Sequence, residues 1–193
     1  RRMLFQSPYL YGCEVKPQSI VKNGYIEKSN RKAFLLDGDK GIFPLLKFQS
    51  KGCLKIVDYI RYKSNDTSHI YLIELTDLKN DIKDCIECEA LLRDTSTDVR
   101  NFVKSLDHDG LKRTQKKLWL ETTEEVKGKW MGSIACYERI LRIRNENIYP
   151  KYHLVIVLKN DTDPKELDLF KTELNNKLSG MTGRIEVLTT GEL

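Results

Sequence analysis

The chain has 193 residues, 40% of them apolar and 32% charged, and carries a formal net charge of +5. This length supports one domain with a full core, and the modest positive charge suits contact with an anionic partner without indicating a dedicated polycation. No apolar run reaches the roughly 18 residues that a membrane-spanning helix needs, so we expect no membrane segment. The five cysteines form an odd set in a chain too large to need disulfides. This favours reduced thiols and a cytoplasmic protein.

The first part of the chain, residues 1–48, consists of short apolar runs broken by turn residues. Examples are Ser19–Val21, Ala33–Leu36 and Ile42–Phe48, with glycine and aspartate between the last two. Runs this short that contain aromatic and β-branched residues are typical of strands. We therefore expect a β-rich N-terminal portion without an amphipathic helix.

Residues 52–80 are predicted to form a β-hairpin around which the rest of the chain is organised. Its strands run over Leu54–Tyr62 and Ser68–Leu75, with a polar turn at Lys63–Thr67. The two-residue period of a strand places Asp58 and Glu74 each on a face with apolar neighbours. A carboxylate on a buried face must be neutral, paired or bound to a metal.

Helical spacing follows the hairpin. Apolar residues recur at three- and four-residue steps from Leu78 to Leu106, which predicts a helical insertion over about residues 78–117. A further helix pair is expected over Leu111–Asn145, with Gly128 and Gly132 as possible interruptions.

The last third of the chain has the pattern of a βαβ unit. Tyr152–Lys159 is a nearly continuous apolar run typical of a buried strand, and Arg184–Leu188 predicts a final strand. Between them, Asp163 and Pro164 give an N-cap and a first helical residue for a helix that ends at Leu178. The whole chain is thus predicted to be a single α/β domain, residues 1–193, with a central mixed sheet flanked by helices.

Asp58, Glu74 sixteen positions later (74 − 58), and the position two residues beyond Glu74 form a pattern that resembles the PD-(D/E)xK nuclease superfamily. The resemblance implies a restriction-endonuclease-like core in which Asp58 and Glu74 hold Mg²⁺ or Mn²⁺. In that family a lysine two positions past the second acid assists the attacking water. Here Thr76 occupies that position, where it would orient the water without supplying positive charge.

The missing charge has to come from another lysine if the resemblance holds. Lys79, Lys127 and Lys129 are the candidates, and the last two precede the helix that is expected to pack against the sheet. Lys79 or Lys129 would then complete the catalytic set of Asp58, Glu74 and Thr76.

Two functions follow from this resemblance. The first is metal-dependent hydrolysis of phosphodiester bonds in nucleic acid, because hard carboxylate oxygens suit Mg²⁺ or Mn²⁺. The alternative is a catalytically inactive module that keeps the fold and binds nucleic acid or a protein partner. The structural explanation is simpler still: Asp58 and Glu74 are acids of an edge hairpin that pair with neighbouring cations.

Other patterns have structural explanations of their own. Asp161 and Asp163, with Glu74, faintly resemble a Toprim metal site, although helix capping explains Asp163. Cys85 and Cys88 lie one helical turn apart and are expected in the core, because a zinc site needs about four ligands.

Basic residues gather near the two tryptophans and predict either a phosphate-binding surface or a solvated mixed face. Acidic residues interleave with them, which favours the mixed face. The basic residues are Lys112, Arg113, Lys116, Lys117, Lys127, Lys129, Arg139, Arg142 and Arg144.

Overall fold

The computed structural model describes residues 14–20, 26–46, 54–63, 66–93, 98, 101–102, 105 and 117–193. Its long helices are α1 (Lys79–Arg93), α4 (Leu120–Ile143) and α5 (Pro164–Leu178). None of the helices in this described part is long and apolar enough to span a membrane.

The fold is α/β, as predicted, with a central mixed sheet. The sheet has six strands in the order β1-β4-β5-β6-β7-β8, and β2 pairs with β3 in a separate two-stranded sheet. Strands β1, β4, β5 and β6 pair antiparallel, whereas β6, β7 and β8 pair parallel. The strands are β1 (Glu14–Val15), β2 (Gln18–Ile20), β3 (Ile26–Lys28), β4 (Ala33–Leu35), β5 (Tyr59–Lys63), β6 (Asp66–Leu75), β7 (Lys151–Leu158) and β8 (Ile185–Thr189).

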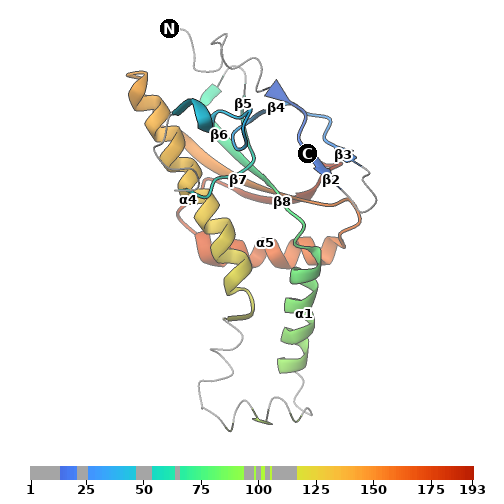
Figure 1. Cartoon of the computed structure of the whole chain (residues 1–193). Helices are drawn as coiled ribbons and strands as arrows, with labels where there is room; N and C mark the ends of the chain where they lie inside the picture. Colours follow the sequence, from blue (N-terminus) through green and yellow to red (C-terminus); the bar gives the residue numbers. More distant parts are fainter. Residues whose placement is uncertain are drawn as a thin grey trace.

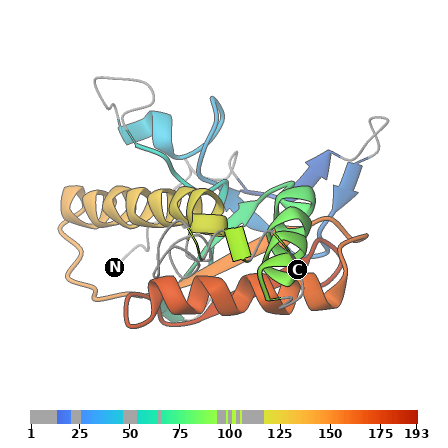
Figure 2. The same ribbon diagram turned by 90° about the horizontal axis from the view of Figure 1, so that it is seen from below.

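The two faces of the sheet have different coverings. One face, here called the helix face, packs its even-numbered β5, β6 and β7 residues against α1, α4 and α5, which Figures 1 and 2 show gathered on one side of the sheet. The opposite face, here called the far face, carries the odd-numbered residues, including Tyr59, Ile73 and Val155. These residues form a smaller core with Ala33 and the last residue, Leu193.

The C-terminal βαβ unit has the predicted structure. Strand β7 is buried over most of its length because helices cover one face and the small second core the other. Helix α5 begins with a capping box, in which Asp163 accepts a hydrogen bond from Lys165 N–H while Glu166 accepts one from Asp163 N–H.

Several predicted boundaries are wrong. The first hairpin strand begins at Tyr59, not Leu54, because the Val57 N–H donates to a side chain of α4 instead of a neighbouring strand. The strand predicted over Ile42–Phe48 is a 3₁₀ turn, η4 (Phe43–Leu46), as far as residue 46, and residues 47–48 lie outside the described residues.

The predicted helices also differ in detail. Helix α4 runs through both Gly128 and Gly132 without a break. Most of the predicted insertion beyond Arg93 lies outside the described residues. Cys85 is buried as expected, but Cys88 is exposed, so only one of the two cysteines faces the core.

Candidate functional site

Asp58 and Glu74 come together where β5 begins and β6 ends. The register between the strands places Tyr59 opposite Ile73. Asp58, the residue before β5, therefore lies beside the last residues of β6. Leu75 N–H donates a hydrogen bond of 2.8 Å to Asp58 Oδ2. Glu74 is only 3% exposed. Asp58 therefore precedes β5 instead of lying within the predicted strand Leu54–Tyr62, and it is still near enough to Glu74 for its charge to raise the pKa of Glu74.

A lysine from α4 reaches the same place. Lys129 Nζ lies 2.5 Å from Glu74 Oε1 and 3.3 Å from Glu125 Oε1. Glu125 and Lys129 are four residues apart, which puts them on one face of the helix. Two acids from the hairpin and one Glu–Lys pair from α4 thus converge on the helix face of the sheet.

Helix α4 is held close to the segment that leads into β5. A side-chain carbon at Gly132 would lie 2.0 Å from the Lys55 carbonyl oxygen, so only glycine permits this approach. The neighbouring Ser133 Oγ accepts a hydrogen bond of 2.8 Å from Val57 N–H and donates one of 2.7 Å to the Lys129 carbonyl. One serine therefore connects the residue before Asp58 with the backbone of Lys129.

The surroundings shift the pKa values of Glu74, Asp58 and Lys129. Burial and the nearby Asp58 charge raise the pKa of Glu74 to about 7, although the bond from Lys129 opposes the shift. Burial likewise raises the pKa of Asp58, against the hydrogen bond from Leu75 N–H and the charge of Lys129. Burial lowers the pKa of Lys129, but its bonds to Glu74 and Glu125 outweigh that effect and leave the pKa raised. Around neutral pH, Glu74 gains or loses a proton while Lys129 stays charged.

A divalent cation is compatible with these residues. Glu74 Oε2 is buried and has no hydrogen-bond partner among the described residues, so one oxygen of a nearly inaccessible carboxylate is uncommitted next to a second acid. Mg²⁺ is usually held by one or two protein carboxylates, with water and substrate phosphate as further ligands. The described residues contain no cluster of three or more acidic, histidine or cysteine side chains suited to a metal. Asp58 and Glu74 therefore fit a Mg²⁺ site in which the protein supplies only two carboxylates.

The other predicted residues lie at the edge of this arrangement. Thr76 follows β6 and is half-buried, and its N–H donates 3.0 Å to the Val157 carbonyl. Lys79 Nζ is bonded to both the carbonyl and the carboxylate of Asp161. Lys127 pairs with Glu124 on the surface of α4. Of the three candidate lysines, Lys129 is the one that contacts Glu74.

Two ion pairs connect the loops that follow β6 and β7. Lys159 pairs with Asp77, and Lys79 pairs with Asp161 at 2.7 Å. The segment after each strand supplies one acid and one lysine, with Lys79 as the first residue of α1, so the pairs connect the carboxyl ends of these parallel strands. Asp161 and Asp163, which resemble a Toprim motif in sequence, are thus an ion-pair partner and a helix cap.

Glu125 is the residue of the site that the sequence analysis did not select. In the sequence it is one of the acidic residues that interleave with the basic residues near the two tryptophans. The available signal was its four-residue spacing from Lys129, a candidate residue on a predicted helix.

The basic residues near the tryptophans are partly described. Arg142 and Lys117 have exposed side chains, whereas residues 112, 113 and 116 lie outside the described part of the chain. The region around α4 also exposes Glu121 and Glu124, which agrees with a mixed face.

Comparison with known proteins gives no match to this chain, whether with family models, curated proteins or solved structures.

Proposed function

We propose that this protein is a metal-dependent nuclease that hydrolyses phosphodiester bonds of nucleic acid at Asp58 and Glu74. The observation that carries the proposal is the contact of Lys129 Nζ with Glu74 Oε1 beside Asp58. The family pattern has a lysine where this chain has Thr76. In this protein, α4 brings a lysine, Lys129, next to the two acids from elsewhere in the chain.

Each residue has a role in this proposal. Asp58 and Glu74 would hold Mg²⁺ or Mn²⁺, which when bound polarises the scissile phosphate and lowers the pKa of a coordinated water. Lys129 provides positive charge where the phosphate accumulates negative charge. Glu125 orients Lys129 through the 3.3 Å ion pair. The Leu75 N–H holds Asp58 in place, and Thr76 would orient water.

The state of Glu74 sets the pH range of this chemistry. Its carboxyl must be ionised to hold a cation, and its pKa of about 7 means that it is largely protonated in acid. We expect cleavage to rise with pH through the neutral range.

The decisive experiment is a cleavage assay on labelled single- and double-stranded DNA and RNA with Mg²⁺ or Mn²⁺. Wild type should cleave at least one of these, whereas Glu74→Gln and Lys129→Met should lose activity by about 10²-fold or more. Lys127→Met, which removes an ammonium two residues from Lys129, is the matched control and should keep wild-type activity. Absence of cleavage by wild type with either metal contradicts the proposal.

The alternative is an inactive module that keeps the same fold and binds nucleic acid or a protein partner. It is favoured by one observation, that Lys129 already neutralises Glu74 in the way a cation would. Binding without cleavage by any variant would support it. Under either function we propose a cytoplasmic location, in line with the odd number of cysteines in the sequence.

A further inference from the structure

Several basic residues lie on the far face of the sheet, opposite the acids. Arg61 of β5 has its pKa lowered by burial and then by the neighbouring charge of Arg31. The pKa of His153 on β7 is lowered by burial, by His69 and by Lys151, with a smaller effect of Arg184. Glu186 also adjoins this group and pairs with Arg184 at 3.1 Å.

These residues form a row across three adjacent strands. Arg61 lies opposite Tyr71, and Tyr71 lies opposite His153, in the sheet register. The Arg61 guanidinium carbon is 5.3 Å from the centroid of the Tyr71 ring, and that ring stacks on His153 at 4.7 Å. His69 stacks on His153 from the neighbouring position, with a 2.7 Å contact between their ring nitrogens.

The row carries hydrogen-bonding groups that are not satisfied internally. Arg61 Nη1 and His153 Nδ1 are buried and have no hydrogen-bond partner among the described residues. His153 is only 6% exposed. A buried guanidinium nitrogen without an acceptor is costly, which indicates that an external acceptor completes it.

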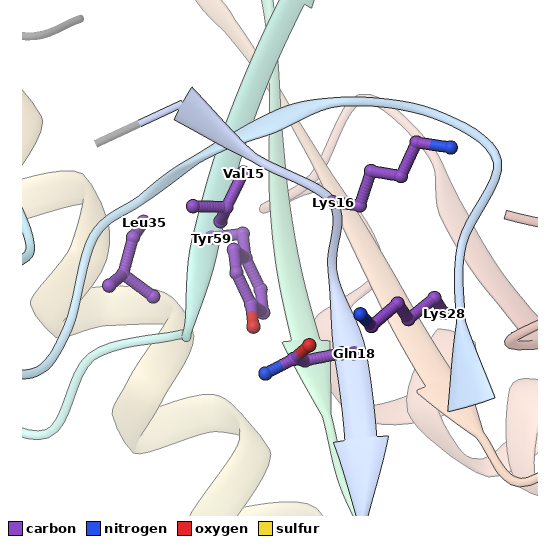
Figure 3. A pocket seen from close by; sticks show the side chains of 6 residues that line it. All are labelled: Val15, Lys16, Gln18, Lys28, Leu35 and Tyr59. Atoms are coloured by element: carbon purple, nitrogen blue, oxygen red, sulfur yellow. The ribbon is translucent and has the colours of Figure 1, made fainter. Parts of the chain in front are cut away.

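A cavity of about 480 Å³ adjoins the row on the same face. Leu35 and Tyr59 line the cavity and lie opposite each other in the sheet. Tyr59 is two residues before Arg61 on β5, so both side chains lie on the far face. Figure 3 shows Lys28 extending toward Gln18 and the hydroxyl of Tyr59, while Lys16 points away from these side chains. The wall of the cavity combines aromatic and aliphatic side chains with ammonium and amide groups, which suits a ligand that has both a flat ring and an anionic group. The volume of the cavity is within the range of small-ligand pockets.

We propose that the far face binds single-stranded nucleic acid, with one nucleotide in the cavity and phosphates at Arg61, Lys151 and Arg184. A paired base cannot enter a recessed cavity, so the cavity selects a single strand over a duplex. The recessed Arg61 is poorly placed for a flat membrane surface. This binding goes beyond the proposed hydrolysis and is independent of it, because the acids and Lys129 lie on the other side of the sheet.

The test measures binding of a fluorescent oligothymidylate of about 12 nucleotides by anisotropy, with EDTA present so that no cleavage occurs. The double variant Lys151→Gln/Arg184→Gln changes two exposed side chains, and thermal unfolding checks that it folds. It should lower the slope of log affinity against log salt by about 1.4, since each contact with a single-stranded phosphate contributes about 0.7. Lys28→Gln should weaken binding further.

The matched control, Arg142→Gln/Lys165→Gln, removes two exposed cations from α4 and α5 and should leave affinity and slope unchanged. Glu74→Gln should bind like wild type even where it does not cleave, which separates this proposal from the nuclease proposal. The proposal is overturned if wild type does not bind the strand at low salt, or if the control variant loses as much affinity as the far-face variant. Equally tight binding of adenosine monophosphate, or preference for vesicles containing phosphatidylserine, would also overturn it.

Discussion

At the scale of single residues, Glu74 dominates the behaviour of the molecule, because it is an acid held in the core beside another acid. A carboxyl that is 3% exposed is stable in its neutral form unless a cation accompanies it. Lys129 provides that cation in part, and a divalent metal would do so more fully.

The raised pKa of Glu74 predicts that stability falls as pH rises. The folded carboxyl has a pKa of about 7 against an ordinary value of 4.5, so the folded state binds more protons between these values. The free energy of unfolding therefore decreases as pH increases through this window, by about 3 kcal/mol in total. Urea unfolding of wild type and Glu74→Gln from pH about 4 to about 8 checks this. The advantage of the variant over wild type should grow with pH, and a constant difference would contradict the assignment.

Removal of the Lys129 charge should raise the pKa of Glu74 further. In Lys129→Met the carboxylate loses its 2.5 Å partner and stays buried, so we expect an increase of about one unit or more. Carbon-13 NMR titration of the glutamate carboxyl groups measures it. Lys129→Arg keeps the charge and is the control, and an unchanged titration in Lys129→Met would show that the pair does not set this pKa.

At the scale of elements, the contact of α4 with residues 54–58 decides whether the site exists. The acids belong to a hairpin, the lysine belongs to a helix, and the two elements are joined through Gly132 and Ser133. The position of Lys129 relative to Glu74 follows from this docking.

The docking gives a contrast between two glycines of one helix. A methyl group at Gly132 collides with the Lys55 carbonyl, so Gly132→Ala should destabilise the protein by about 1 to 3 kcal/mol and reduce activity. A Cβ at position 128 would have no atom within 4 Å outside its own helix turn, so Gly128→Ala should stabilise the helix by up to about 1 kcal/mol. Chemical denaturation of both variants measures the contrast, and similar effects of the two substitutions would contradict the proposed close approach.

The same elements explain what sequence could and could not reveal. Helix α5 was predictable because its signals, Asp163 and Pro164, are local. The start of β5 was not, because Ser133 takes the Val57 N–H from 76 positions away. The sequence offered Lys129 as a candidate only because it is a lysine, since its contact with Glu74 spans 55 positions. The far-face row was missed because Arg61, Tyr71 and His153 come together only through strand register.

At the scale of the whole molecule, the sheet separates an acidic site on its helix face from a group of basic residues on its far face. The helix face holds the buried Glu74, the half-buried Asp58 and the proposed cation, whereas the far face holds the Arg61 guanidinium, one nitrogen of which has no partner among the described residues. The mixed sheet was predictable from the order of its elements, but the sequence did not indicate that its helices share one face.

Cation binding should stabilise the whole fold. A metal that binds only the native site raises the melting temperature by mass action, by an amount that grows with metal concentration. Addition of Mn²⁺ should raise the melting temperature more at pH about 8 than at pH about 6, because Glu74 is ionised at the higher pH. Differential scanning fluorimetry measures this, with Asp58→Asn and Glu74→Gln expected to abolish it. An equal rise in those variants would place the metal elsewhere.

The hydrogen bond from Leu75 N–H to Asp58 makes that amide a built-in spectroscopic probe. Its proton faces a carboxylate instead of the carbonyl of a paired strand, at 2.8 Å. Its resonance therefore moves when Asp58 gains a proton or shares its electrons with a cation. A single backbone signal can report on the occupancy of the site in the unmodified protein, without substrate, label or substitution.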